Sequence, residues 1–344
     1  MSGFFPSLLK KNTRLFFPAA GLFLGIAGFF LSVKISDYFF IKNSQTYLIN
    51  PLAETRKRLN TLTFEYMPFG DKIRRLNDLL IKDGLAGSIS VYFRDLDNGW
   101  WFGINENDFF YPMSLLKVPI MIAWLKFDEI KPGVLDDIIV FSDADREIIL
   151  ASKTDNNYSA HLDPDGSYSV WDLIKAMILF SDNTAADILH RNIEKKFLNQ
   201  VYRDLGINNE DDIFRISLKR YSVFFRILYN ASYLNITNSH KALRLLTKAD
   251  FNRGIRRAMP PDITISHKYG IRSSDQNSKE LHHVAIVYYP GKPFLLGIMT
   301  RGKEISKLYF VIETIADLIY REVNAQVQYK KNNSYTDLSE GDIF

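Results

Sequence analysis

The sequence predicts an α/β domain whose antiparallel sheet is flanked by helices and joined to an all-α lobe, with a transmembrane helix before it. Strand-forming segments occur near both ends of the domain, at 88–105 and 262–302, and the segment between them has mainly helical periodicity. If these strands share one sheet, the helices between them form a separate lobe. An uncharged run at 15–33 predicts the membrane helix.

The composition is that of an ordinary globular protein with a sizeable core. Of 344 residues, 47% are hydrophobic and 24% are charged. The 43 basic and 39 acidic residues nearly balance and no block of five like charges occurs, so we expect no nucleic-acid partner. The absence of cysteine excludes disulfides and thiolate metal ligands and leaves the compartment open. We expect no cofactor.

The N-terminus predicts a single-pass anchor in the cell membrane. Residues 15–33 are uncharged and about as long as a bilayer-spanning helix, roughly 20 residues. Lys10, Lys11 and Arg14 precede them, and the positive-inside rule therefore places residues 1–14 in the cytoplasm and the rest of the chain outside. The alternative is a cleaved signal peptide, but the run is long for one and no clear A-x-A site follows it.

Three further segments follow the anchor. Residues 34–68 mix polar and aromatic residues without a clean period, which indicates a stalk. Residues 69–325 form the predicted catalytic domain. Residues 326–344 are polar, and we expect a disordered tail there.

The domain opens with a helix and a hairpin. Segment 70–83 has apolar residues at helical spacing and stops at Gly84, a residue type common just after helix ends. Asp97, Asn98 and Gly99 then separate two strand-like runs, which is typical of a β-hairpin turn.

Helices dominate the middle of the domain, and strands return at its end. The pattern from about 115 to 250 is mainly helical, with a polar loop near 151–168 and a helix that Ser169 can cap. Three strand-like segments follow: 262–270, 281–291 and 292–302. The segment 304–323 is a strongly amphipathic helix.

The stretch "FFYPMSLLKVPIMIAWLKF" at 109–127 places Ser114 and Lys117 one helical turn apart among apolar residues. A hydroxyl is a weak nucleophile unless a base takes its proton, and desolvation lowers the pKa of a lysine enough to make it that base. The alternative is a lysine that reaches to solvent past a serine that caps the helix.

Two later sites offer matching chemistry. In "SDN", the Ser181 hydroxyl can relay a proton and the Asn183 amide can hold a substrate carbonyl, or the motif merely caps the next helix. In "HKYG", Lys268 lies on a strand beside Gly270, where a missing side chain lets a substrate backbone approach. The alternative there is a solvated lysine before a turn glycine.

Together, "SLLK", "SDN" and "KYG" resemble, in order, the S-x-x-K, S-D-N and K-T-G motifs of class A β-lactamases and penicillin-binding proteins. The order of predicted elements across about 70–323 is also similar to the β-lactamase/transpeptidase fold. The stretches "YPMSLLKVPI", "SDNTAADIL" and "RRAMPPDITISHKYG" support the likeness.

The resemblance implies a role for each matching residue. Ser114 is the expected acylated nucleophile, Lys117 its proton acceptor, and Ser181 the proton donor to the leaving nitrogen. Lys268 would keep the site positive and Asn183 would bind the substrate's side-chain amide. The backbone N–H groups of Ser114 and Ile271 would hold the oxyanion, and each such donor is worth roughly 3–4 kcal/mol of barrier.

The chain departs from the family pattern after the "SDN" motif. Class A enzymes carry a glutamate in an E-x-x-L-N setting that activates the deacylating water, and no such motif occurs here. The only glutamates between Asn183 and Lys268 are Glu194 and Glu210. Loss of a general base usually costs about 100- to 10,000-fold, so we expect slow deacylation.

A second departure concerns Tyr269, which stands where the family has Thr or Ser to bind the β-lactam carboxylate. We expect its hydroxyl to point elsewhere. The residues that can replace this contact are Arg272, Ser273, Ser274, His282 and His283. For the two histidines, a surface residue beside a core residue is the simpler interpretation. His161, Asp163 and Asp165 fit a loop turn better than a metal site.

These observations favour a membrane-anchored extracytoplasmic serine hydrolase that resembles class A β-lactamases. Its expected substrate is a β-lactam or the D-Ala-D-Ala end of a peptidoglycan peptide. The alternatives are a D,D-peptidase of cell-wall peptides, acting as carboxypeptidase or transpeptidase, and a non-catalytic envelope protein that retains the fold. The sequence leaves the oligomeric state open.

Overall fold

The computed structural model describes residues 48–50, 69–154, 161–207, 214–273 and 278–339. The predicted anchor at 15–33 and its cytoplasmic flank lie outside these residues, as does most of the predicted stalk. Within the described ranges, no helix has both the length and the apolar character that a membrane span requires.

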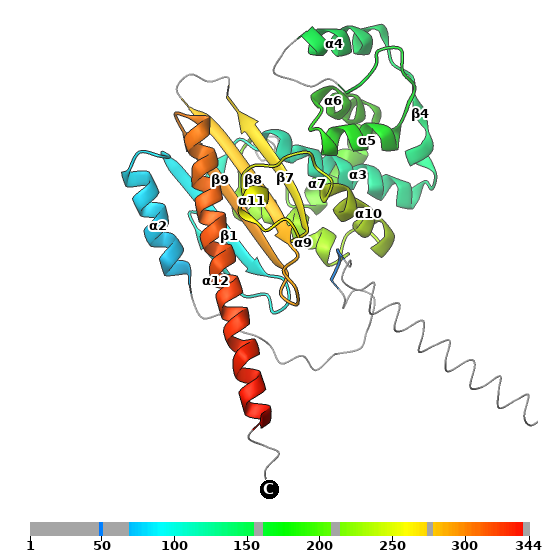
Figure 1. Cartoon of the computed structure of the whole chain (residues 1–344). Coiled ribbons are helices and arrows are strands. Elements are labelled where there is room, and N and C mark those ends of the chain that lie inside the picture. Colours follow the sequence, from blue (N-terminus) through cyan, green and yellow to red (C-terminus); the bar gives the residue numbers. More distant parts are fainter. Residues whose placement is uncertain (1–47, 51–68, 155–160, 208–213, 274–277, 340–344) are drawn as a thin grey trace, which may run out of the picture. The chain divides into compact units, whose positions relative to one another are not determined.

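Strands from both ends of the domain form one five-stranded antiparallel sheet, as the sequence predicts (Figure 1). Its members are β1 (Ser88–Asp95), β2 (Trp101–Ile104), β7 (Ile265–Arg272), β8 (Lys279–Val287) and β9 (Phe294–Gly302). The order in the sheet is β2-β1-β9-β8-β7. The N-terminal hairpin therefore pairs with the last strand, with Val91 opposite Ile298.

The predicted hairpin turn is present, and a second tight turn joins the last two strands of the sheet. Gly99 has φ +83° between β1 and β2, and Gly291 has φ +73° between β8 and β9, a region that favours glycine. The Asp95 carboxylate accepts the Asp97 backbone N–H at 2.7 Å, which ties the first turn to the end of β1.

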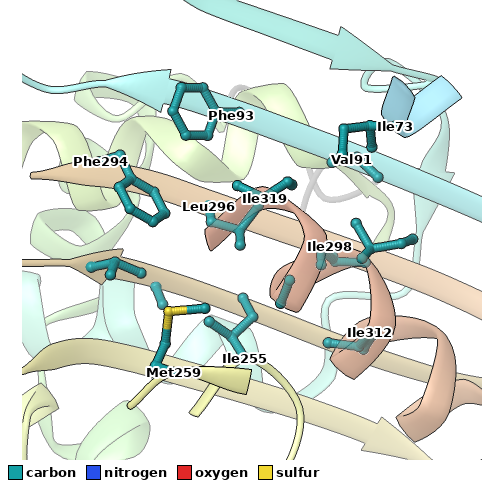
Figure 2. Packing of buried hydrophobic residues seen from close by; sticks show 14 of the residues in the cluster. Ile73, Val91, Phe93, Ile255, Met259, Phe294, Leu296, Ile298, Ile312 and Ile319 are labelled. Carbon is teal, nitrogen blue, oxygen red and sulfur yellow. The ribbon is translucent and has the colours of Figure 1, made fainter. Parts of the chain in front are cut away.

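Three helices cover one face of the sheet: α2 (Gly70–Lys82), α11 (Ile255–Ala258) and α12 (Ile305–Ser339). Figure 2 shows Ile312 and Ile319 of α12 in one hydrophobic cluster with Leu296 and Ile298 of β9. All four side chains are fully buried. The amphipathic pattern of the last helix therefore predicted its buried face correctly.

The helix α12 extends past the predicted domain boundary. It continues to Ser339, so the expected disordered tail is wrong for residues 326–339, which are helical. Val327 belongs to the hydrophobic core, and Gln326 is buried beside it. Because Val327 lies one turn after the buried Val323, the apolar stripe continues beyond the end of the predicted helix.

The other face of the sheet packs on α9 (Leu218–Tyr229), beyond which lies the predicted helical lobe (Figure 1). Its helices are α3 (Lys117–Ile130), α4 (Asp143–Thr154), α5 (Val170–Leu179), α6 (Asn183–Asn192), α7 (Lys195–Asp204) and α10 (Ile236–Leu246). Ser169 forms a reciprocal capping box with Asp172 at the start of α5, as expected. The expected polar loop begins later than residue 151, because α4 runs to Thr154.

Short elements connect these layers. They are η3 (Met113–Leu116), η4 (Val134–Asp136), the pair β3 (Phe109–Phe110) and β6 (Ile216–Ser217), and the pair β4 (Ile138–Ile139) and β5 (Tyr168–Ser169). Of these, β3 and η3 matter most for function because they lead directly into α3.

Part of the predicted stalk packs against the domain. Ile49 is 1% exposed, and the Leu48 carbonyl accepts the Tyr288 hydroxyl at 2.9 Å. Asn50 donates its backbone N–H to the Tyr229 carbonyl. Residues 48–50 therefore belong to the same compact unit as the domain, although the sequence predicted that the domain begins at residue 69.

The packing of α12 predicts a clear stability difference between two neighbouring positions. Ile312→Ala should lower the free energy of unfolding by about 2–5 kcal/mol because it leaves a cavity against β9. Phe310→Ala, at a side chain that is 53% exposed, is the matched control and should change it by about 1 kcal/mol or less. Chemical denaturation followed by circular dichroism measures both, and equal losses would contradict the assignment of the buried face.

Candidate active site

Ser114 lies in the 3₁₀ turn η3, immediately before α3. Lys117 is the first residue of α3, and its Nζ is 3.0 Å from Ser114 Oγ. Met113, just before the serine, has φ +51°, an uncommon conformation for a non-glycine residue. The spacing therefore brings the two groups together as predicted, although through a 3₁₀ turn rather than within a regular α-helix.

Lys117 is a buried residue, only 4% exposed, which excludes the alternative of a lysine that reaches to solvent. Its Nζ also contacts Ser181 Oγ at 3.2 Å, Asn183 Oδ1 at 2.6 Å and the Ser181 carbonyl. Burial lowers the pKa of Lys117 to about 8, against the opposing charges of Asp182 and Asp187. About one molecule in ten then has a neutral Lys117 at pH 7.

The three residues of "SDN" lie at the junction between α5 and α6, where one of them caps a helix and the other two contact Lys117. Asp182 caps α6, because its Oδ1 accepts the Ala185 N–H at 2.9 Å, and its Oδ2 accepts the His161 N–H at 3.1 Å. Ser181 has φ +59°. Capping therefore explains the aspartate of "SDN", whereas Ser181 and Asn183 both contact Lys117.

Lys268 is fully buried in β7, so it is not a solvated strand residue. Its Nζ lies 2.8 Å from Ser181 Oγ, and Ser181 thus joins the two lysines. Burial first, and the charge of Lys117 second, lower the pKa of Lys268 well below its usual value. The expected role of Lys268 in keeping the site positive stays a prediction.

Tyr269 lies beside Lys268 at the edge of the site. Burial raises the pKa of the Tyr269 hydroxyl, against a smaller opposing effect of Ser181, and the Tyr269 ring stacks on Phe251 with centroids 3.7 Å apart. Lys268 Nζ lies 4.5 Å from the centre of the same ring. Stacking on Phe251 and the contact with Lys268 hold the ring at the site, and the expectation that its hydroxyl points elsewhere stays a prediction.

Gly270 lets β7 approach the turn that carries the nucleophile. A Cβ at this position would lie 3.1 Å from the Pro112 carbonyl oxygen and 3.4 Å from Met113 Cβ. The missing side chain of Gly270 therefore allows β7 to pack closely against the turn at Pro112 and Met113, whereas its expected role towards a substrate backbone stays a prediction. Ile271 follows in the same strand, half-buried, and its pairing with Ser114 as an oxyanion hole stays a prediction.

The structure places the loop residues near 161–165 and one of the two glutamates that lie between Asn183 and Lys268 in the sequence. Within the described residues, no group of three or more His, Asp or Glu side chains is placed to hold a metal ion. Asp163 accepts the Asp165 backbone N–H at 3.2 Å, as in a loop turn. Glu194 is exposed at the start of α7, and Glu210 lies outside the described residues.

Comparisons with known proteins identify the family and the fold of the chain. The family model described as "Beta-lactamase enzyme family" matches residues 71–323. The chain belongs to this β-lactamase family. No curated protein matches its sequence.

Solved structures establish the β-lactamase fold for the chain. A class A beta-lactamase from Mycobacterium abscessus has a TM-score of 0.63 and 21% identity, covering 73% of this chain and 99% of that one. A beta-lactamase from Francisella tularensis has a TM-score of 0.62 and 20% identity, covering 74% and 99%. PBP-A has a TM-score of 0.63 and 17% identity, covering 76% and 99%. At these identities, the structures show the fold alone.

In this β-lactamase family member, three polar residues hold the backbone just before Ser114. The sequence analysis did not identify them as a group. Glu280 Oε2 accepts the Tyr111 N–H at 3.1 Å, and His282 Nε2 lies 3.1 Å from the Tyr111 carbonyl oxygen. Arg301 donates to the Phe109 carbonyl at 3.0 Å and to Glu280 Oε1 at 2.7 Å. We call Glu280, His282 and Arg301 the polar clamp.

The polar clamp is buried where it meets β3. Glu280 and His282 are both 0% exposed, and the Phe110 ring packs edge-on against His282 with centroids 5.2 Å apart. His282 Nδ1 accepts the Thr300 N–H, so its Nε2 carries the proton that faces Tyr111. A glutamate in the otherwise mainly apolar strand "ELHHVAIV" was the available sequence signal.

The second histidine is also buried, so the expectation of a surface histidine is wrong. His283 is 0% exposed, its Nδ1 accepts the Ile255 N–H at 3.0 Å, and its Nε2 lies 2.9 Å from His267 Nδ1. Burial lowers the pKa of His267 to about 3 and that of His283 well below its usual value. His282 and His283 do point to opposite faces of the strand, but both faces of this sheet are covered by helices, so neither side chain reaches the surface.

The polar clamp predicts that Glu280 controls the reactivity of Ser114. Glu280→Gln puts one amide NH₂ against either the Tyr111 N–H or the Arg301 guanidinium, both of which are donors. We expect Ser114 to react with a fluorophosphonate about 10- to 100-fold more slowly, because small displacements of a nucleophile are costly. Intact mass measures the rate.

The matched control for this experiment is Glu304→Gln, which removes an exposed carboxylate paired with Lys307. It should react at the rate of the unaltered protein. Unchanged reactivity of Glu280→Gln, in a protein whose circular dichroism is native, would show that the clamp does not position the nucleophile.

Proposed function

We propose that this chain is an extracytoplasmic serine hydrolase that forms an acyl-enzyme at Ser114 with a β-lactam or a D-Ala-D-Ala-like amide. The observation that carries the proposal is the 3.0 Å approach of Lys117 Nζ to Ser114 Oγ, with the pKa of Lys117 lowered to about 8. A serine hydroxyl beside a lysine that is readily deprotonated is an activated nucleophile. The related fold of PBP-A supports this substrate class, since a mutant of that protein is described as an acyl-enzyme complex with penicillin-G.

Acylation follows from the connected hydrogen bonds. Neutral Lys117 takes the Ser114 proton while Oγ attacks the amide carbonyl carbon, and a tetrahedral oxyanion forms. Ser181 then gives its proton to the leaving nitrogen as the C–N bond breaks. Lys117 returns the proton to Ser181 across the 3.2 Å contact, so the base is neutral again and the proton balance is zero.

Asn183 is oriented to bind a substrate carbonyl. Its Oδ1 faces Lys117 Nζ at 2.6 Å, and the amide NH₂ group is directed away from this bond. An amide whose oxygen is fixed in this way presents its two N–H donors in one direction. This geometry supports the role that the resemblance implies, binding of a substrate side-chain amide.

Lys268 would gain its charge with the substrate. Burial makes the free amine neutral more readily than in water, and an incoming carboxylate favours the ammonium form. Tyr269 follows Lys268 in β7 and stands where the family pattern has the smaller Thr or Ser.

The missing water-activating glutamate supports slow release of the acyl group. No E-x-x-L-N motif follows Asn183, and Glu194 is exposed at the start of α7. Without a positioned base, hydrolysis of the ester should be about 100- to 10,000-fold slower than with one. The second candidate is a D,D-peptidase of cell-wall peptides, and this observation favours its transpeptidase form because an amine acceptor needs less activation than water.

We also propose that the enzyme is held at the outer side of the cell membrane by the helix predicted at 15–33. The uncharged run and its basic flank support this placement. Residues 48–50, which pack against the domain, follow that helix by 14 residues, 34–47.

The proposed function predicts a long-lived adduct at Ser114. The full chain in neutral detergent, incubated with a fluorescent penicillin, should gain one penicillin mass on the peptide that contains Ser114 and lose it over hours. Ser114→Ala should gain none, whereas Ser142→Ala, which removes a serine hydroxyl bonded to Asp145, should behave as the unaltered chain does. No adduct would refute the substrate class, and loss of the adduct within seconds would refute slow deacylation.

A further inference from the structure

A cavity distinct from the Ser114 site lies between α9, the β1–β2 hairpin and the end of α7. Its volume is about 910 Å³. The residues that matter for its chemistry are Arg94, Trp101, Asp204, Lys219 and Arg226. Ser114, Lys117, Ser181 and Lys268 do not line it, so we treat it as a separate feature and call it the cationic groove.

Three cations of the cationic groove have no ion-pair partner among the described residues. Arg94, Lys219 and Arg226 form no ion pair with any other residue that the structure describes. The acid in the lining, Asp204, accepts the Tyr233 hydroxyl at 2.9 Å. Arg220 also lines the cavity, so four cations face it while the whole chain carries a net charge of only +4.

The cations are arranged along a line rather than around a point. Lys219 and Arg226 are seven residues apart on one face of α9, a rise of roughly 10 Å. Arg94 approaches the same cavity from β1. A single small anion cannot span this length, whereas a chain with repeated negative charges can contact both ends.

Aromatic rings form part of the wall of the groove and hold one of its cations. Lys219 Nζ lies 4.6 Å from the centre of the Trp101 ring, and Tyr92 stacks on the same indole with centroids 5.7 Å apart. The Trp101 side chain is still 40% exposed. Its fluorescence therefore reports on ligands that bind beside Lys219.

We propose that the cationic groove binds a linear polymer whose repeats carry phosphodiester groups. Arginine presents a planar fork of donors that matches the paired oxygens of a phosphate, and Arg94 and Arg226 can each take one such group. The polymer would run along α9, with Lys219 as a third contact. Such binding would hold the enzyme on an anionic envelope polymer, and it does not depend on the chemistry of Ser114.

The test is a fluorescence titration of the full chain in neutral detergent with poly(glycerol phosphate). We expect saturable quenching that weakens as salt rises and that is reduced in Trp101→Phe. Arg94→Gln and Arg226→Gln should each weaken binding about tenfold, since each removes a charge-assisted hydrogen bond. The control Arg321→Gln, which removes an exposed cation on α12, should bind like the unaltered chain.

The outcomes separate this proposal from the proposed function. Ser114→Ala should bind the polymer normally, so loss of acylation leaves the titration unaffected. Absence of saturable quenching, or equal weakening by Arg321→Gln and Arg226→Gln, would overturn the proposal. Equal binding of polyglutamate would overturn the preference for phosphate, and equal binding of phosphatidylglycerol vesicles would overturn the preference for a polymer.

Discussion

The burial of the Lys117 amine against Ser114 is the interaction on which the site depends. Placing this group in the interior lowers its pKa to about 8, and below that pH the folded state holds an ammonium ion that burial disfavours. The cost to the folded state is about 3 kcal/mol there and disappears above the ordinary lysine pKa, because the neutral amine carries no such penalty. The Lys117 amine is held in this position by its contacts with Ser181 and Asn183.

The rest of the fold supports that buried amine from three sides. The junction before α6 supplies Ser181 and Asn183, and β7 supplies Lys268. The polar clamp on β8 and β9 holds the backbone that precedes Ser114. Elements that are far apart in the sequence therefore meet at one serine, and the sheet on which the clamp and Lys268 lie is held in place by the core under α12 (Figure 2).

Much of this arrangement was predictable from the sequence, because it follows local rules. The spacing of Ser114 and Lys117 brought the two together, and the turn glycines and the amphipathic last helix predicted the sheet and its cover. The polar clamp was not predictable, because the contact of Glu280 with Tyr111 joins residues 169 positions apart and depends on how distant strands align. The lowered pKa of Lys268 was not predictable for a related reason, since it depends on complete burial beside a second lysine.

The pH dependence of acylation at Ser114 tests the central claim most directly, because only neutral Lys117 can accept the proton. The rate of adduct formation with a fluorescent penicillin should rise about tenfold per pH unit in the acidic range and level off near the pKa of about 8. A rate that is independent of pH, or one that keeps rising towards the ordinary lysine pKa of about 10.4, would contradict a buried lysine base.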